Sequence, residues 1–245
     1  MEAAERKYLA QADHVLTVSD HDREVFSQWL DSSKLSVIPT GVDTVYFRPG
    51  AEPEIENSLV FTGSMDWLPN EDGMLYFIKE ILPLLREQAP RISLSIVGRN
   101  PSTRLNAAIS QESNIVATGW VEDIRPFLAQ SEVCIVPLRI GGGTRLKIFE
   151  AMSMGKAVVS TSIGAEGLPV ADGEHILLAD DPAAFARSVV SLLRDDSRRR
   201  RIGVAARKLV EENYSWRQVA RVFSDALRGV AAAPAGERTV AQPPS

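Results

Sequence analysis

The sequence predicts an α/β fold with a doubly wound parallel sheet, and two observations support this. Short apolar runs alternate with longer segments of helical period along the 245 residues, which is typical of strand–helix–strand units. Several runs are apolar throughout, such as residues 133–136, as expected of parallel strands that helices cover on both faces. In such a sheet a ligand binds at the carboxyl ends of the strands.

The alternation also predicts where the elements lie. Apolar, β-rich runs predict strands at residues 15–18, 35–38, 59–62, 92–97, 115–118, 133–137, 157–161 and 175–178. Apolar residues at helical spacing predict helices at 20–30, 70–88, 103–111, 124–130, 144–154, 182–194, 197–213 and 216–228.

The domain organisation is uneven at the two ends. Almost no chain precedes the first strand–helix unit, so we interpret residues 1–32 as the end of another domain. Residues 33–213 contain a complete set of α/β elements, and 214–230 a C-terminal helix. Residues 231–245 lack periodic apolar positions and are expected to form a disordered tail.

Composition narrows the class of protein. Apolar residues make up 44% of the chain and charged residues 24%, as in ordinary soluble globular proteins. The net charge of −5 excludes the global positive field that holds nucleic acid. The single cysteine, Cys134, excludes an internal disulfide and fits a reducing compartment. Neither a signal peptide nor an apolar run near the roughly 20 residues of a membrane span is found, so we expect a cytoplasmic protein.

The stretch after the expected strand at 133–137 carries the strongest chemical signal. Three consecutive glycines, 141–143, leave backbone N–H groups unshielded before a helix expected to open near Thr144. The helix N-terminus adds partial positive charge, so the stretch predicts a phosphate cradle. Arg145 and Lys147 would add full charges beside it.

Glu150 lies farther along the same, mostly apolar helix. A carboxylate buried there needs hydrogen-bond donors, and the two hydroxyls of a ribose would supply them. The alternative interpretation is a flexible glycine turn, with Glu150 facing solvent or an arginine. The stretch is neither a Walker loop nor a G-x-G-x-x-G pattern.

A second glycine turn follows the expected strand at 59–62. Gly63 would let a ligand approach the backbone, and Ser64 or Asn70 would donate hydrogen bonds to it. The alternative is a capped loop in which Trp67 covers the core.

Two charged stretches have simpler interpretations. Asp20 and Asp22 resemble a metal-binding D-x-D pair, but helix capping after Ser19 explains both. The basic run at 198–201 predicts a solvated helix face, with contact to anionic lipid as the alternative. Scattered histidines and one cysteine give no metal cluster, and no G-x-S-x-G elbow is found.

An ordered set of motifs resembles family 4 retaining glycosyltransferases of the GT-B fold. The set comprises Gly-Gly-Thr-Arg-Leu-Lys-Ile-Phe-Glu-Ala-Met (142–152), Gly-Lys-Ala-Val-Val-Ser-Thr (155–161), Val-Ile-Pro-Thr-Gly-Val-Asp (37–43), Leu-Ser-Ile-Val-Gly (94–98), Thr-Gly-Trp-Val (118–121), Asp-Gly (172–173) and Tyr-Ser-Trp (214–216). The resemblance covers about residues 12–228. It implies a Rossmann-like doubly wound sheet that is the C-terminal, donor-binding half of a GT-B fold.

The resemblance also implies site residues. It places Glu150 on the ribose, the 118–121 loop on the base, and the Gly63–Ser64 turn by the phosphates. Lys147 and Arg145 are the expected catalytic residues, because catalysis here stabilises a departing diphosphate. The implied donor-binding set is Gly63, Ser64, Asn70, Gly119, Trp120, Val121, Gly142, Gly143, Thr144, Arg145, Lys147 and Glu150. No cofactor and no metal are expected beyond the nucleoside-diphosphate sugar.

Three departures from the family pattern stand out. Gly142 occupies the position of a glutamate that usually contacts the donor sugar. Ser64 and Asn70 lie where an arginine and a lysine commonly grip the diphosphate, and Arg145 and Lys147 are expected to replace that charge. The acceptor domain is missing, apart from residues 1–32, which we interpret as its last strand–helix unit.

The implied function is transfer of a sugar, with retention, from a nucleotide sugar to an unknown hydroxyl acceptor in polysaccharide or glycoconjugate biosynthesis. The implied partners are an N-terminal acceptor-domain polypeptide and, through a peripheral contact, a membrane; nucleic acid is not expected. The alternative is a non-catalytic nucleotide-sugar-binding module of a split or truncated enzyme. A nucleotide-sugar epimerase is disfavoured, because no carboxylate and histidine set converges on the sugar end.

Overall fold

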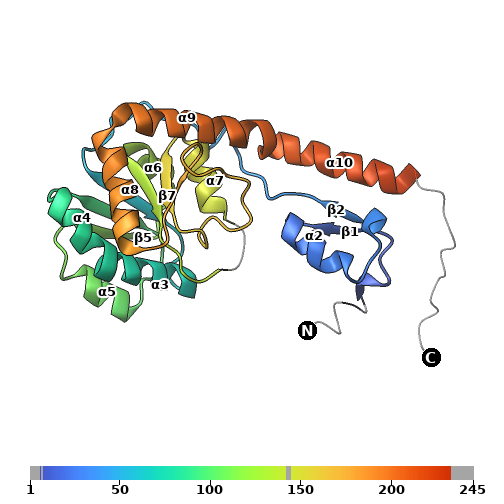
Figure 1. Ribbon diagram of the computed structural model, residues 1–245, viewed down its shortest axis with the longest axis horizontal. Coiled ribbons are helices and arrows are strands. Elements are labelled where there is room, and N and C mark those ends of the chain that lie inside the picture. The colour runs from blue at the N-terminus through green and yellow to red at the C-terminus, as the bar shows by residue number, and fades with distance from the viewer. Residues whose placement is uncertain (1–5, 7, 142–144, 233–245) are drawn as a thin grey trace. The chain divides into compact units, whose positions relative to one another are not determined.

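The computed structural model describes residues 6, 8–141 and 145–232 (Figure 1). Contacts divide the chain into two compact units. The larger is Thr40–Trp216, and the smaller combines Met1–Pro39 with Arg217–Ser245.

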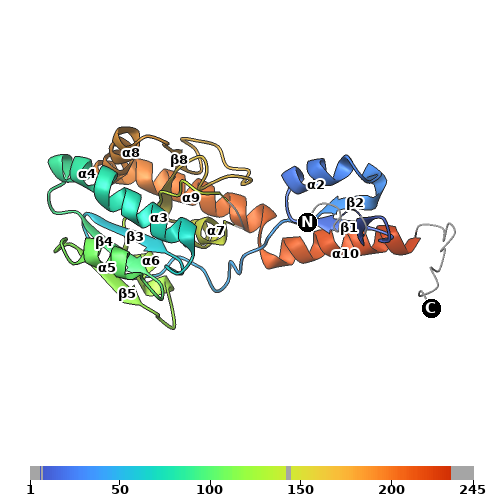
Figure 2. The same cartoon turned by 90° about the horizontal axis from the view of Figure 1, so that it is seen from below.

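The larger unit contains a six-stranded sheet in the order β5-β4-β3-β6-β7-β8, and every strand pair is parallel. The strands β3, β4 and β5 can be followed side by side in Figure 2. The strand bounds are β3 (Ser58–Thr62), β4 (Ser93–Val97), β5 (Ile115–Gly119), β6 (Val133–Val136), β7 (Ala157–Ser160) and β8 (Leu177–Leu178). Since the first strand lies in the middle and the chain adds strands to both sides, the predicted doubly wound parallel sheet is confirmed.

The central strands show why apolar runs form this sheet. All residues of β3, β6 and β7 are buried. Because neighbouring side chains of a strand point to opposite faces, full burial means that both faces are covered. The covering helices of this unit are α3 (Leu68–Tyr76), α4 (Leu82–Gln88), α5 (Thr103–Ile109), α6 (Arg125–Gln130), α7 (Leu146–Ser153), α8 (Pro182–Arg194) and α9 (Asp196–Asn213).

The helix expected at 70–88 is interrupted. A π-helical segment, Phe77–Ile81, separates α3 from α4. Pro83 follows it at the start of α4 and has no N–H to donate to the preceding turn. The interruption is therefore a local consequence of the proline.

Helix α9 approaches the turn after α7 through Gly203. A Cβ at this position would lie 2.0 Å from the carbonyl oxygen of Gly155. We expect Gly203→Ala to lower the free energy of unfolding by about 1–3 kcal/mol, because the overlap outweighs the gain in helix propensity. Urea denaturation measures the change.

Gly229 in the C-terminal helix is the matched control. A Cβ there meets nothing within 4 Å. Gly229→Ala should therefore be neutral or slightly stabilising. Equal denaturation midpoints for the two variants would contradict the close contact at Gly203.

The smaller unit pairs two strands from the start of the chain. Strand β1 (Val15–Thr17) is parallel to β2 (Leu35–Val37), and α2 (Asp20–Ser27) connects them together with a short 3₁₀ turn, Ser32–Lys34. Ser19 caps α2 by accepting the N–H of Asp22 at 3.1 Å, as predicted.

The pairing of β2 corrects one expected boundary. Residues 33–39 were expected in the nucleotide-binding domain 33–213, but they belong to the smaller unit, and the division falls after Pro39. The physical reason is the ladder to β1, which the N–H of Ile38 extends by donating to the carbonyl of Thr17 at 2.8 Å.

Helix α10 (Trp216–Ala232) completes the smaller unit. It runs past residue 228, so 231 and 232 are helical and not part of a tail; residues 233–245 lie outside the described part of the chain. Its apolar face leaves Val222, Phe223 and Leu227 exposed. None of the helices described has the length and apolar character needed to cross a bilayer.

Candidate functional site

The order in which the chain adds strands to the sheet reverses between β3 and β6. These two strands are neighbours although β4 and β5 lie between them in the sequence. At such a switch point the loops leave the carboxyl ends of the two strands in opposite directions, and ligands bind in the crevice between them. The Gly63–Ser64 turn follows β3, and α7 follows β6. The Gly63–Ser64 turn and the helix that carries Lys147 and Glu150 therefore come to one place.

A row of glycines lines this edge. Gly63 adopts φ +150° and donates its N–H to the carbonyl of Val97 at 3.0 Å. Gly98 adopts φ +156°, and a Cβ there would lie only 1.8 Å from the Gly63 carbonyl oxygen. Gly98 also forms a bridge with Gly119, the last residue of β5. The carboxyl ends of three strands thus meet through residues that have no side chain.

Lys147 and Asn70 join the two sides of the switch point. The Nζ of Lys147, on α7, lies 2.6 Å from the Oδ1 of Asn70, on α3. The Nδ2 of Asn70 donates in turn to the carbonyl of Ser64 at 2.8 Å. The Lys147 ammonium also lies 4.1 Å from the ring centroid of Phe61. The sequence pointed to Asn70 and Lys147 separately, and the structure brings them together.

The electrostatics of this cluster are unusual. Burial lowers the pKa of Lys147 to about 7. Burial also raises the pKa of Glu150, and Lys147 opposes that shift. The buried Cys134 thiol has its pKa raised to about 12, again by burial, and so stays protonated. Lys147 is thus only partly charged near neutral pH, and an anion placed beside it would restore the full charge.

Glu150 lies three residues beyond Lys147 on the same partly exposed side of α7. Its neighbour Phe149 is buried and stacks on Tyr214, with ring centroids 4.7 Å apart, which fixes the helix in place. In the part of the chain that the structure describes, the Glu150 carboxylate makes neither a hydrogen bond nor an ion pair. The alternative of an arginine partner is not what the structure shows.

Arg145 lies elsewhere. Its buried guanidinium donates to the carbonyl of Ile163 at 2.9 Å and lies 3.4 Å from a carboxylate oxygen of Glu166, in the segment after β7. Burial lowers the pKa of Arg145. Its catalytic role stays a prediction.

The glycine-rich loop itself is described only in part. Helix α7 begins at Leu146, with Arg145 as the preceding cap residue, and not near Thr144 as expected. Gly142, Gly143 and Thr144 lie outside the described residues. Their roles in holding a diphosphate stay predictions.

The turn after β3 is tied to the loop after β4. The Oγ of Ser64 donates to Asp66 at 2.6 Å and accepts from the Nε of Arg99 at 3.0 Å. Asn100, at φ +56°, donates to the same carboxylate at 2.9 Å. Sequence reasoning missed Arg99; its signal is its position directly after the glycine that ends a central strand.

Trp67 is exposed, at 58% of its surface, so the alternative in which it covers the core is wrong. The residues expected to contact the nucleotide base lie at the end of β5, the edge strand, and directly after it. Gly119 adopts φ +70°, Trp120 is 73% exposed and Val121 is partly exposed. They share the carboxyl edge with the cluster, but β4 and β3 separate them from β6. Their contact with a base stays a prediction.

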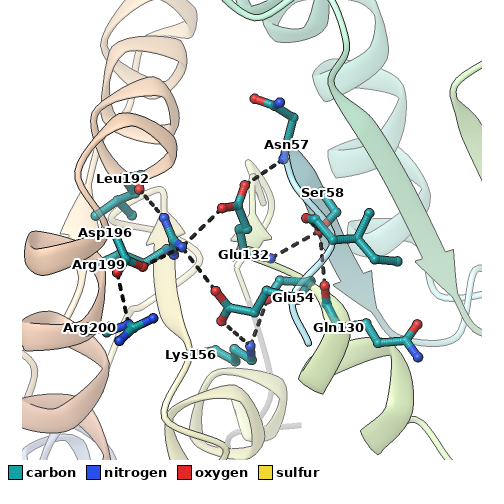
Figure 3. A network of polar contacts seen from close by, with 12 residues as sticks. Glu54, Asn57, Ser58, Gln130, Glu132, Lys156, Leu192, Asp196, Arg199 and Arg200 are labelled. Atoms are coloured by element: carbon teal, nitrogen blue, oxygen red, sulfur yellow. Dashed lines mark hydrogen bonds and ion pairs between the residues drawn. The ribbon is translucent and has the colours of Figure 1, made fainter. Parts of the chain in front are cut away.

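The basic run at 198–201 is solvated only in part. Figure 3 shows Arg199 inside a network at the amino ends of the strands, where it pairs with Glu54 and Glu132, both at 3.1 Å. It is buried because these carboxylates, together with Asp196 and the carbonyl of Leu192, accept its hydrogen bonds in place of water. Arg200 and residue 201 are exposed, as expected of a solvated face. The network fixes the segment before β3 to the far end of the sheet.

The described residues contain no group of three or more His, Cys, Asp or Glu side chains placed to hold a metal ion. A cavity of about 470 Å³ opens beside the network of Arg199 at the amino ends of the strands, away from the switch point. It is lined by Glu52, Pro53, Glu54, Glu56, Glu132, Asp196, Arg199 and Arg200.

The strand order and the polar cluster at the switch point define a Rossmann-like domain of the GT-B glycosyltransferase type. Residues 56–195 match the model of the family described as "Glycosyl transferases group 1". The chain belongs to this family, and the resemblance found in the sequence is confirmed.

Three similar proteins illustrate the relationship. The GDP-mannose-dependent alpha-(1-6)-phosphatidylinositol monomannoside mannosyltransferase of Mycolicibacterium smegmatis is 28% identical, over 89% of this chain and 63% of its own length. A glycosyltransferase structure from Rickettsia africae has a TM-score of 0.79 at 18% identity, covering 94% of this chain and 68% of its own. Anabaena HepE, solved with UDP and glucose, has a TM-score of 0.73 at 15% identity, covering 90% and 63%.

The structural likenesses show the fold alone. The chain spans between 44% and 66% of the lengths of the first curated relatives it matches. Those relatives therefore contain substantial sequence without a counterpart here.

Proposed function

We propose that this chain is the donor-binding half of a glycosyltransferase that takes a sugar from a nucleoside-diphosphate sugar and transfers it, with retention, to a hydroxyl acceptor. The observation that carries the proposal is the Glu150 carboxylate, partly buried and without a described partner, beside Lys147 at the switch point. The HepE structure with UDP and glucose supports a nucleotide-sugar ligand in this fold.

The chemistry follows from the leaving group. When the bond from the anomeric carbon to the diphosphate breaks, negative charge grows on the departing phosphate oxygens. Lys147 is already protonated at this stage, because its pKa of about 7 rises beside the bound diphosphate, and its charge stabilises the departing oxygens. The acceptor oxygen attacks the anomeric carbon on the face that the diphosphate leaves, which retains the configuration. Its proton passes to an oxygen of the departing nucleoside diphosphate, which is left bound to the chain. No cofactor is proposed.

The proposed partners are an acceptor domain and a membrane surface. The relatives are longer, which supports an additional acceptor-domain polypeptide that contributes the acceptor site. The relative named as a phosphatidylinositol monomannoside mannosyltransferase supports a role in glycoconjugate biosynthesis, and the phosphatidylinositol in that name supports a peripheral contact with a membrane. Incubation with one labelled UDP- or GDP-sugar tests the reaction: a new α-glycoside supports transfer, whereas binding without transfer supports the non-catalytic module.

Glu150→Ala tests the ribose contact. We expect the Kd for UDP or GDP, whichever binds more tightly, to rise about 10- to 100-fold in calorimetry, because a charged acceptor of two hydrogen bonds is lost. The 2′-deoxy diphosphate should bind the variant as well as the ribose form does, whereas the wild-type chain should prefer ribose.

The control is Glu87→Ala, on the exposed side of α4. It should leave both affinities unchanged. If Glu150→Ala keeps the wild-type preference for ribose, the assignment of Glu150 to the ribose is wrong.

A further inference from the structure

Two nitrogen donors converge above Gly63. The position that a Cβ would occupy there lies 2.8 Å from the Nδ2 of Asn70 and 2.8 Å from the Nζ of Lys147. A side chain at position 63 would therefore crowd both groups, and the glycine keeps the backbone beside them clear for a ligand, next to a lysine that has lost much of its hydration.

One cation at this point does not balance a diphosphate. Ser64 and Asn70 are neutral, and the guanidinium of Arg145 is engaged with Ile163 and Glu166. Arg139, on the loop after β6, pairs with Asp72 at 2.6 Å and covers the ring of Tyr76. A second cation must come from another loop.

Arg99 is held beside the next residue of the same turn. Its Nε donates to the Oγ of Ser64 at 3.0 Å, and the single hydroxyl proton of Ser64 goes to Asp66. This chain of bonds fixes the guanidinium through Nε alone. Within the residues that the structure describes, neither terminal nitrogen of Arg99 makes a hydrogen bond, and its side chain is 61% exposed.

We propose that Arg99 contacts the donor diphosphate and acts with Lys147 as the pair of cations that holds it, one on either side of the Gly63–Ser64 turn. The inference rests on the proposed function. Lys147 lies beside Gly63 and Arg99 beside Ser64, so the two cations flank neighbouring residues of one turn and can each reach one of two linked phosphate groups. The forked terminal nitrogens of an arginine fit two oxygens of one phosphate.

The test measures UDP, GDP, UMP and GMP binding to the full chain by calorimetry. For the nucleotide base that the wild-type chain prefers, Arg99→Gln should raise the Kd of the diphosphate about 10- to 100-fold, and that of the monophosphate less. Arg91→Gln is the matched control, since Arg91 is an exposed arginine paired with Glu56 at the opposite end of β4. It should change neither Kd by more than about twofold.

Asp66→Asn separates contact from mere support of the turn. An asparagine keeps an acceptor for Ser64 but removes the negative charge beside Arg99, so the Kd of the diphosphate should fall about two- to fivefold. If Arg99 only braces the turn, this variant should bind more weakly.

The outcomes distinguish the two proposals. If the wild-type chain binds neither UDP nor GDP, the proposed function and this inference both fail. If it binds and Arg99→Gln binds equally well, or loses diphosphate and monophosphate affinity equally, only the inference is overturned.

Discussion

Replacing Lys147 with methionine is expected to weaken UDP or GDP binding about a hundredfold without weakening the fold. The ammonium lies beside Gly63, where no side chain shields it, and the substitution removes one of the two cations proposed to hold the diphosphate. Methionine keeps the length of the side chain and removes a charge that is costly to bury. The free energy of unfolding at neutral pH should stay within about 1 kcal/mol of wild type, or rise.

The same substitution predicts a change with pH. The pKa of Lys147 is about 7 in the folded chain, below the ordinary value of 10.5, so the unfolded chain binds more protons between these two values. Wild-type stability therefore gains from this group as pH rises from about 7 to 10.5. Lys147→Met lacks that gain, and its advantage over wild type is largest at pH 7 and below. Urea denaturation at pH 6, 8 and 10 measures it.

Nucleotide binding adds a second readout. A bound diphosphate raises the lysine pKa, so the wild-type chain should take up close to one proton on binding UDP or GDP at pH 8. Calorimetry in buffers of different ionisation enthalpy measures this uptake. Equal uptake by Lys147→Met would show that another group takes the proton.

Lys156→Met is the contrasting control. Lys156 is also buried, but its ammonium donates to Glu54 at 2.6 Å and to the carbonyls of Ala129 and Ser131 at 2.7 and 2.8 Å. Removing it leaves the two buried carbonyls without this donor and leaves Glu54 with Arg199 as its remaining partner, so we expect a loss of about 3–5 kcal/mol in unfolding free energy. We therefore expect Lys147→Met to lower nucleotide affinity and Lys156→Met to lower the free energy of unfolding.

The sequence predicts the sheet well because burial on both faces leaves a plain signal. The run at 133–136 is apolar throughout, and the structure buries all of it. The sequence shows less clearly which sheet a strand belongs to. The residues of β2 are as compatible with the large sheet as with β1, and only the backbone ladder decides. The boundary after residue 32 was therefore misplaced by one strand.

The candidate site was predictable in its residue types but not in its contacts. Gly63, Asn70 and Lys147 each follow a strand, and the rule for parallel sheets brings such loops together. The direction of a long side chain is not set by that rule. Arg145 turns toward Glu166, whereas Arg99 lies against Ser64, because local partners decide where each guanidinium rests.

Gly98→Ala is expected to lower the free energy of unfolding by about 2–6 kcal/mol. The new methyl carbon would overlap the Gly63 carbonyl oxygen at 1.8 Å, and φ +156° is unfavourable for a residue with a side chain. A backbone oxygen cannot swing aside as a flexible side chain can. Strand β3 or the loop after β4 must shift instead, and with it the turn that carries Ser64.

Gly119→Ala separates strain from overlap. Gly119 also has a positive φ, +70°, but a Cβ there meets nothing within 4 Å. Its cost should be about 1–2 kcal/mol, from the backbone alone. Urea midpoints of the two variants give the difference, and equal midpoints would mean that the loops after β3 and β4 are not in contact. If these loops are in contact, folded Gly98→Ala should also bind UDP or GDP more weakly than folded Gly119→Ala, because only Gly98→Ala displaces the turn that carries Ser64.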